Sequence, residues 1–127
     1  MPYAFLAVGC GAFFGACLRY ALSLVLNPVF PTLPFGTLAA NLLGGLVMGL
    51  TIGASSHFQA LPPEARVFLT TGFLGGLTTF STFSAETVTL LMRQEYIWTF
   101  AIIFLHLMGS LTMTVVGFAS AHVIWRV

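Results

Sequence analysis

Long apolar segments alternate with short polar or proline-containing turns along this chain. Four of these segments have the length of a membrane span: residues 3–26, 35–54, 64–92 and 96–125. An α-helix needs about 20 mostly apolar residues to cross a bilayer. The pattern therefore predicts an all-α membrane protein with four transmembrane helices, built as one domain over residues 1–127.

The third segment contains a motif that an ordinary transmembrane helix avoids. Residues 72–83 read GFLGGLTTFSTF, so three glycines fall within five positions and four hydroxyl side chains follow them. Non-helical backbone at membrane depth is tolerated where it is buried in protein or lines a water-filled path. We therefore predict that the third helix is broken in mid-membrane near residues 75–79. A site for an ion or a small polar solute is expected at the break.

Composition supports membrane insertion and excludes several classes of function. The chain is 58% hydrophobic and 6% charged, with a mean hydropathy of +1.02 and a net charge of +1. Soluble domains carry about a quarter charged residues, so a water-exposed surface cannot be built from this sequence. Without a basic run, nucleic acid is not an expected partner. Neither a metal-ligand cluster nor a nucleophile with its base and orienting acid is visible, so an enzyme is not expected.

The arginines show no bias between the two sides of the membrane. With four spans, both termini lie on one side together with Arg66 and Arg126. Arg93 lies on the opposite side, and Arg19 lies in the half of the first span nearest that opposite side. Loops rich in Arg and Lys normally stay in the cytoplasm. A chain without this bias can insert in both orientations, which permits antiparallel pairing. The alternative is a weakly biased monomer whose orientation is set by other signals.

Polar side chains in three of the segments recur on shared helix faces. Residues four apart lie on the same face of a helix, and hydroxyl and amide N–H groups donate hydrogen bonds to anions. The stripes therefore predict a track of donors, although a single hydroxyl can instead bond to its own helix at the i−4 carbonyl. The candidate residues are Thr37 and Asn41 in the second segment, Ser81, Thr82 and Glu86 in the third, and His106, Ser110 and Thr114 in the fourth.

Two phenylalanines and one arginine are further candidates. Phe80 and Phe83 lie three apart just after the glycines and are expected to stack on one face. The edge of an aromatic ring carries partial positive charge and can favour a small anion, although contact with core or lipid is the alternative. Arg19 either reaches to the membrane surface or draws an anion into a vestibule.

Glycines are expected to act in two ways. Those at four-residue spacing, Gly11 and Gly15 and then Gly45, Gly49 and Gly53, let helices approach closely. The glycines of the break instead free carbonyl oxygens, which inside a membrane can coordinate a monovalent cation. The alternative is that neighbouring hydroxyls or a partner helix satisfy these carbonyls.

Three motifs give the chain a resemblance to a known family. Residues 11–20 (GAFFGACLRY), 35–44 (FGTLAANLLG) and 72–83 resemble three motifs of the Fluc family of small bacterial fluoride channels, also called CrcB. Those motifs are GxxxGAxxRY, GTLxxNxxG and GxxGGxTTFSTF, in the same order and covering the same spans. The third motif is the most specific, and every signature position in it is filled.

The resemblance implies an antiparallel, dual-topology homodimer with two pores in the bacterial cytoplasmic (inner) membrane. Through these pores fluoride would leave the cytoplasm down its gradient, and chloride would be rejected. It also implies a structural Na⁺ that is not transported, held at the two-fold axis by the backbone carbonyls of Gly75 and Thr78. His106 stands where some members are expected to carry a hydroxyl.

The resemblance further implies individual roles along the path. It places Phe80, Phe83 and Asn41 in the pore and Glu86 along the permeation path. It places Arg19 near an aqueous vestibule. The hydroxyl track would include Ser81, Thr82 and Ser110.

The strongest rival is a small multidrug transporter, which is also four-span and dual-topology. That class uses a first-span carboxylate to exchange protons for cationic drugs, whereas the first span here has Arg19 and no acidic residue. A non-transporting scaffold is the second rival, and it would need neither the donor stripes nor the break.

Overall fold

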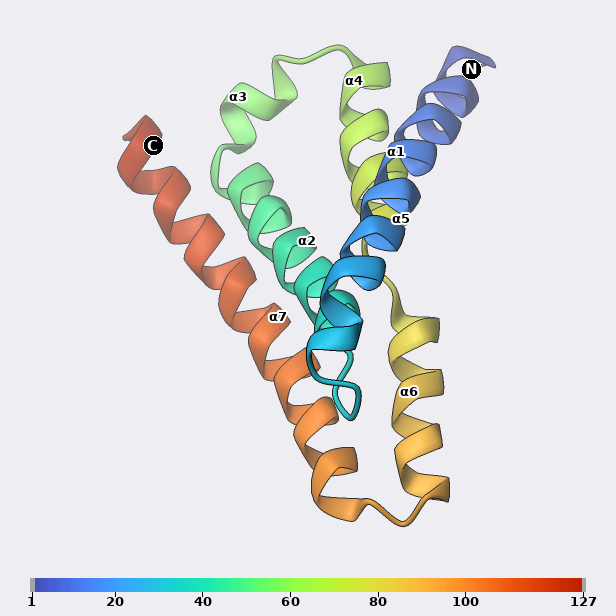
Figure 1. Cartoon of the computed structure of the whole chain (residues 1–127). Helices are drawn as coiled ribbons and strands as arrows, with labels where there is room; N and C mark the ends of the chain where they lie inside the picture. Colours follow the sequence, from blue (N-terminus) through green and yellow to red (C-terminus); the bar gives the residue numbers. More distant parts are fainter. Residues whose placement is uncertain (1, 127) are drawn as a thin grey trace.

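The computed structural model describes residues 2–126, and over this range the chain forms helices joined by turns (Figure 1). Three helical stretches are long and apolar enough to cross a membrane. They are α1 (Pro2–Leu26) with the short 3₁₀ turn η1 (Asn27–Val29), α2 (Phe35–Gly53) and α7 (Tyr96–Trp125). The all-α prediction is confirmed for the described residues, and the bounds of these three spans agree with the sequence within a few residues.

The third segment is divided into several helical pieces. It contains α4 (Pro63–Val67), the π-helical η2 (Phe68–Leu74), α5 (Gly75–Leu77) and α6 (Phe80–Met92). Between α5 and α6 the backbone is extended, with ψ of 155° at Thr78 and φ of −150° at Thr79. Each piece is shorter than a membrane-spanning helix. Residues 64–92 are therefore not one continuous helix, and the chain leaves the helical conformation inside the predicted window.

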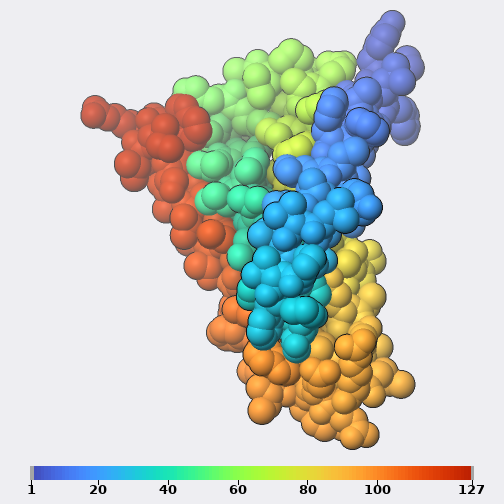
Figure 2. Space-filling view, viewed as in Figure 1, coloured from blue at the N-terminus to red at the C-terminus, as the bar shows by residue number. Residues whose placement is uncertain are grey.

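The helices pack in two groups around this interrupted segment. Helix α2 packs along α7, and α1 packs against η2 and α5. Helix α6 contacts α7, and the short α3 (Ser55–Gln59) connects the end of α2 towards α4. Both termini lie at one end of the molecule, and the turn between α6 and α7 lies at the opposite end (Figure 1). The end with the termini is wide, and the opposite end is narrow (Figure 2).

The glycines at four-residue spacing lie where helices touch. A Cβ atom on Gly45 would come within 2.9 Å of the Ser110 carbonyl oxygen on α7. One on Gly15 would lie 2.8 Å from the backbone nitrogen of Leu77. Real Cβ contacts are not this short, so these positions accept only glycine at the present helix separation. The prediction that these glycines serve helix packing is confirmed.

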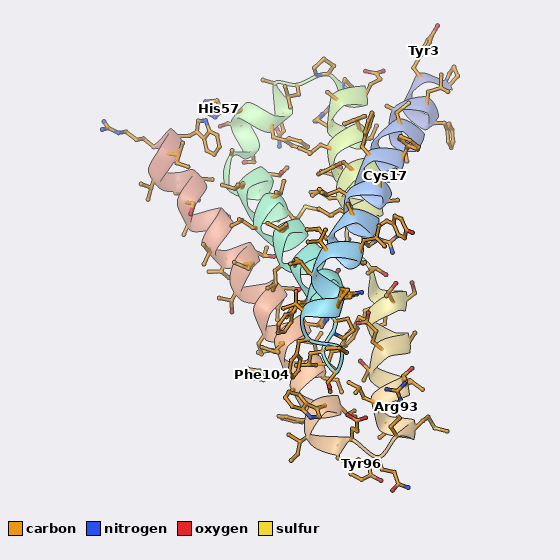
Figure 3. All side chains as sticks on the ribbon, in the orientation of Figure 1. Tyr3, Cys17, His57, Arg93, Tyr96 and Phe104 are labelled. Carbon is orange, nitrogen blue, oxygen red and sulfur yellow. The ribbon has the colours of Figure 1, made fainter. Side chains whose placement is uncertain are left out.

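Most of the outer surface is apolar. Exposed large side chains include Phe5, Phe13, Phe100 and Val115, whereas the buried core is limited to small clusters such as Leu33, Phe83, Leu90 and Ile102. This distribution suits a chain surrounded by lipid, because the hydrocarbon core solvates apolar side chains. Tyr3 and His57 lie at one end of the molecule and Arg93 and Tyr96 at the other (Figure 3). Aromatic and charged side chains at both ends are typical of membrane interfaces.

Candidate functional site

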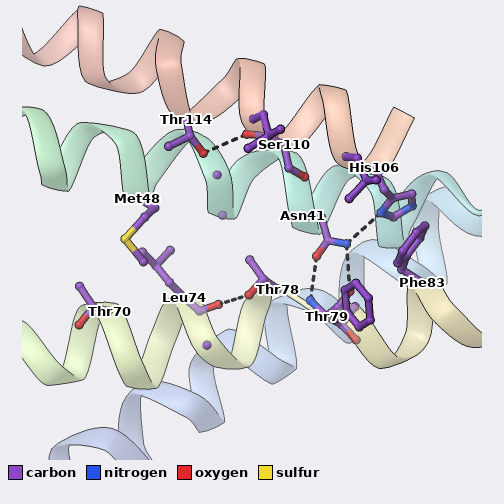
Figure 4. Close-up of a pocket in the computed structure, with 16 residues that line it drawn as sticks. Asn41, Met48, Thr70, Leu74, Thr78, Thr79, Phe83, His106, Ser110 and Thr114 are labelled. Carbon is purple, nitrogen blue, oxygen red and sulfur yellow. Dashed lines mark hydrogen bonds between the residues drawn. The ribbon is translucent and has the colours of Figure 1, made fainter. Parts of the chain in front are cut away.

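A groove of about 480 Å³ lies between α2, α7 and the interrupted segment (Figure 4). It extends along the break and brings together residues that are far apart in the sequence. Met48, Thr70, Leu74 and Thr79 line it in addition to predicted residues. The predicted residues in its lining are Asn41, Gly75, Thr78, Phe80, Phe83, His106, Ser110 and Thr114. The groove does not include Arg19, Thr37, Ser81, Thr82 or Glu86.

Asn41 connects three elements at one end of the groove (Figure 4). Its Oδ1 accepts a hydrogen bond from the Thr79 N–H at 2.7 Å, and its Nδ2 donates to the Thr79 carbonyl at 3.0 Å. The same Nδ2 lies 2.9 Å from His106 Nδ1 on α7. The side chain thus replaces the helical partners that Thr79 loses where α5 ends. Asn41 holds the extended backbone in place, a structural role that sequence patterning did not predict.

Thr79 starts helix α6 and is absent from the residues predicted for the site. Its Oγ1 accepts from the Thr82 N–H at 3.1 Å and donates to the Thr82 hydroxyl at 3.0 Å. A threonine at the N-cap satisfies one of the free N–H groups at the start of a helix. The signal was available in the sequence, because threonine is a favoured N-cap residue and Thr79 directly precedes Phe80, the first residue of α6. The hydroxyl of Thr82 is engaged in this cap and is not directed into the groove.

The break releases two backbone carbonyls. In a continuous helix, the carbonyl of Gly75 would accept from the N–H of Thr79, and the carbonyl of Thr78 would accept from the N–H of Thr82. Here the Thr79 N–H donates to Asn41 and the Thr82 N–H donates to the Thr79 hydroxyl. The two carbonyls named by the family resemblance therefore lose their helical donors. Such oxygens are suitable ligands for a hard monovalent cation.

Gly75 differs from the packed glycines. It is exposed, and the nearest contact of a Cβ atom there with the described residues would be the Thr70 carbonyl oxygen, at 3.9 Å. Its neighbour Gly76 packs closely on α1, where a Cβ atom would lie 2.5 Å from the Ala12 carbonyl oxygen. Contacts within the chain therefore explain the glycine at position 76 but not the one at position 75.

Arg19 is tied to the interrupted segment. Its Nε–H donates to the Gly76 carbonyl at 3.0 Å, and the residue is half-buried. An arginine that satisfies a carbonyl near the end of α5 stabilises the break, because this carbonyl lies next to non-helical backbone. Spacing in the sequence could not have identified this pair, which is separated by 57 positions.

Phe80 and Phe83 occupy different environments. Phe83 is 8% exposed, and its ring centroid lies 4.7 Å from that of His106 at an interplanar angle of 31°. Phe80 is 74% exposed and meets Phe83 edge-on, with centroids 5.5 Å apart and planes at 65°. The expectation that the two rings stack is therefore wrong in its geometry. The edge-on arrangement arises because Phe83 turns into the core, while Phe80 remains at the mouth of the groove.

The predicted hydroxyls are only partly available. Thr114 donates back to the Ser110 carbonyl at 2.9 Å, which is the i−4 alternative. Within residues 2–126 the hydroxyl of Ser110 has no hydrogen-bond partner, and it lies in the groove lining. Ser81 is exposed outside the groove, with its Oγ 3.4 Å from the Thr79 hydroxyl.

Thr37 and Glu86 form a separate pair beyond the groove. The Thr37 hydroxyl is buried and donates to Glu86 Oε1 at 2.6 Å. Among the described residues, Glu86 Oε2 is buried without a hydrogen-bond partner. The prediction that both residues lie along the permeation path stays a prediction.

Comparison with known proteins gives a consistent family. Residues 6–118 match the family model described as CrcB-like protein, Camphor Resistance (CrcB). The chain is 64% identical to the Fluoride-specific ion channel FluC of Nitrosospira multiformis over 115 residues, which cover 91% of this chain and 90% of that protein. It is 56% identical to the protein of the same name from Aromatoleum aromaticum over 123 residues, covering 97% of this chain and 93% of that one.

A third relative, from Thiobacillus denitrificans, carries the same name and is 55% identical over 117 residues, which cover 92% of this chain and 94% of that protein. The matches span the apolar helices and the interrupted segment together. The chain therefore belongs to the CrcB family and is a multi-pass protein of the bacterial inner membrane.

Proposed function

We propose that this protein is a fluoride-selective channel that lets F⁻ leave the cytoplasm passively and so relieves fluoride toxicity. Its relatives are named as fluoride-specific ion channels. The observation that carries the proposal is the chemistry of the groove. The lining contains hydroxyl, amide, imidazole and aromatic side chains, and none of the described residues that line it is Asp, Glu, Lys or Arg.

Uncharged hydrogen-bond donors in the groove suit an anion that must enter the path and also leave it. Fluoride that enters the groove loses part of its hydration shell, and hydroxyl and ring-edge contacts replace part of that shell. Conduction requires binding that is strong enough for entry and weak enough for exit. Phe80, Phe83 and Ser110 provide such contacts, and a fixed positive charge would hold the ion more tightly.

The groove chemistry disfavours the small multidrug exchanger as an alternative. A path for cationic drugs and protons is expected to need a carboxylate, and none of the described residues that line the groove carries one. Glu86 is paired with Thr37 outside the groove.

The working unit in this proposal is an antiparallel homodimer with two pores. Residues 64–92 then form a fourth, broken membrane span within a single four-span domain. Support comes from the exposed side of the break, where Phe80 is 74% exposed and Gly75 has open space beside it. Freed carbonyls and exposed hydroxyls are costly in lipid. A second copy packed on this side would remove them from lipid and close the groove into a path.

A structural Na⁺ that is not transported is part of the same proposal. The carbonyl oxygens of Gly75 and Thr78 would hold it, because both have lost their helical donors. The ion would supply positive charge at the dimer axis and link the two breaks.

The test is anion efflux from liposomes that contain the purified protein, followed with a fluoride electrode. Fluoride should leave rapidly, while chloride efflux and uptake of a cationic drug stay at the level of empty liposomes. Drug uptake coupled to proton movement would support the exchanger instead. No flux of either kind from correctly inserted protein would favour the scaffold.

A further inference from the structure

The amide of Asn41 has no free N–H. One N–H donates to the Thr79 carbonyl at 3.0 Å, and the other points to His106 Nδ1 at 2.9 Å. The amide oxygen accepts from the Thr79 N–H at 2.7 Å. A primary amide has only two N–H donors. An anion in the groove therefore meets an Asn41 side chain whose donors are already engaged.

The orientation of the amide determines the tautomer of His106. A backbone N–H can only donate, so the atom of Asn41 that faces the Thr79 N–H must be the oxygen. The NH₂ group then faces His106 and can only donate, so Nδ1 must accept. In a neutral imidazole the proton is therefore on Nε2. Nε2 is buried without a hydrogen-bond partner among residues 2–126. Among these residues, the bond from Asn41 is therefore the contact that selects the tautomer.

Packing holds the imidazole in place to accept this bond. His106 is 4% exposed, and Phe83 lies against its ring with centroids 4.7 Å apart. Phe83 thus orients His106, His106 engages Asn41, and Asn41 holds the extended backbone at Thr79. These four residues, from α2, α7 and α6 with its N-cap, form one connected arrangement in the groove lining (Figure 4).

We propose that His106 is a positioning residue that competes with the permeant anion for the second N–H of Asn41. This inference rests on the proposed fluoride channel. The two bonds to Thr79 hold the backbone of the break, whereas the bond to His106 joins two side chains. The latter can be exchanged for an anion without unravelling the break. His106 therefore sets how readily Asn41 offers an N–H to fluoride.

Removing the acceptor should make fluoride bind more tightly. In His106→Leu the second N–H of Asn41 has no partner, so fluoride no longer displaces an imidazole. The net value of one hydrogen bond corresponds to a decrease of roughly threefold to tenfold in the half-saturating fluoride concentration. His106→Asn should stay close to the wild type, because its side-chain oxygen can take the place of Nδ1. His122→Leu, an exposed position on the same helix, is the matched control.

Fluoride efflux is measured against fluoride concentration for all four proteins, so that the half-saturating concentration is separated from the maximal rate. A role limited to stability would lower the amount of active protein and leave the half-saturating concentration unchanged. An unchanged half-saturating concentration in a folded His106→Leu variant overturns the proposal. The proposal also fails if His106→Asn lowers the half-saturating concentration as much as His106→Leu does.

A second measurement does not depend on transport. Solid-state NMR of ¹⁵N-histidine-labelled protein at neutral pH should show His106 with bare Nδ1 and protonated Nε2, identified by its loss in His106→Asn. Asn41→Leu should remove this preference. A protonated Nδ1 in the wild type overturns the inference even if His106→Leu fails to fold. If the wild type conducts no fluoride, the proposed function fails, and this measurement still decides whether His106 accepts from Asn41.

Discussion

Two glycines in different parts of the molecule have opposite surroundings: one is packed against a neighbouring helix, and the other has open space beside it. Gly49 lies against α7, where a Cβ atom would be 2.9 Å from the Phe118 backbone nitrogen, whereas the nearest atom to a Cβ on Gly75 would be 3.9 Å away. Gly49 lets α2 pack directly on α7, whereas Gly75 lies on a surface that the rest of the chain does not cover. In the proposed dimer, this difference would separate residues that hold a single chain together from those available to an ion or to a second copy.

The same contrast extends to the groove walls. Phe83 is buried and Phe80 is exposed. The Thr114 hydroxyl is bonded to its own helix, whereas the Ser110 hydroxyl has no hydrogen-bond partner among residues 2–126. Substitution of the buried or bonded member of each pair should change stability where the side chain fills the core, and should have little effect where its bond is easily replaced. Phe83 also lines the groove, so its substitution should affect function as well. Substitution of the open member should affect function with little effect on the stability of the protomer.

The largest effect is expected for the glycines. Gly49→Ala forces α2 away from α7, because the added methyl group would overlap the Thr114 carbonyl oxygen. Overpacking against backbone should cost about 3 kcal/mol or more in the free energy of unfolding. Gly75→Ala should leave that free energy unchanged or raise it by about 0.5 kcal/mol, because alanine favours helix. Thermal unfolding in detergent measures both.

Assembly distinguishes the two glycine variants. Gly75→Ala should reduce the dimer fraction measured by cross-linking in liposomes and should remove any stabilisation of the dimer by Na⁺. Gly76→Ala is the control, because that position packs on α1 and should instead destabilise the protomer. A Gly75→Ala protein with normal dimerisation and normal sodium response would show that the uncovered glycine faces lipid alone.

Much of the fold could be predicted from sequence, because membrane spans depend on apolar length and on the residues that interrupt it. Pro28 and Gln94 lie in turns that end the first span and the third segment, and the two glycine series mark the packed faces. The interruption of the third segment could be predicted within residues 75–79, because glycine and hydroxyl side chains there compete with the helix. These are local properties of the chain.

The hydrogen bonds between side chains and backbone within the site could not be predicted in the same way. The bonds from Asn41 to Thr79 and His106, and from Arg19 to Gly76, join positions that are 38 to 65 residues apart. Only the packing of the helices brings these groups together. Periodicity identified Asn41 and His106 as residues on polar helix faces, but it could not show that their side chains form a hydrogen bond with each other.

The phenylalanine pair should give the next largest effect. Phe83→Ile removes a buried ring that contacts His106 and should cost about 1–2 kcal/mol in the free energy of unfolding. Phe80→Ile at an exposed position should change that free energy by less than about 0.5 kcal/mol. Both should lower fluoride efflux sharply while the dimer still assembles, because an aliphatic side chain has no positive ring edge. Normal efflux in Phe80→Ile would remove the ring-edge argument, since that variant keeps the core intact.

The hydroxyl pair should show the smallest effect and the finest distinction. Ser110→Ala removes a hydroxyl that lines the groove without a partner among the described residues, and fluoride efflux should fall severalfold at unchanged stability. Thr114→Val keeps the shape of the side chain and removes only a bond to the Ser110 carbonyl, so efflux should stay within about twofold of the wild type, as expected for a hydroxyl occupied by its own helix. Efflux from liposomes at equal protein content measures both. An equal loss in the two variants would mean that the Thr114 hydroxyl leaves its carbonyl when the ion passes. In that case, a hydrogen bond within the helix of the resting protein would not distinguish a structural hydroxyl from a conducting hydroxyl along α7.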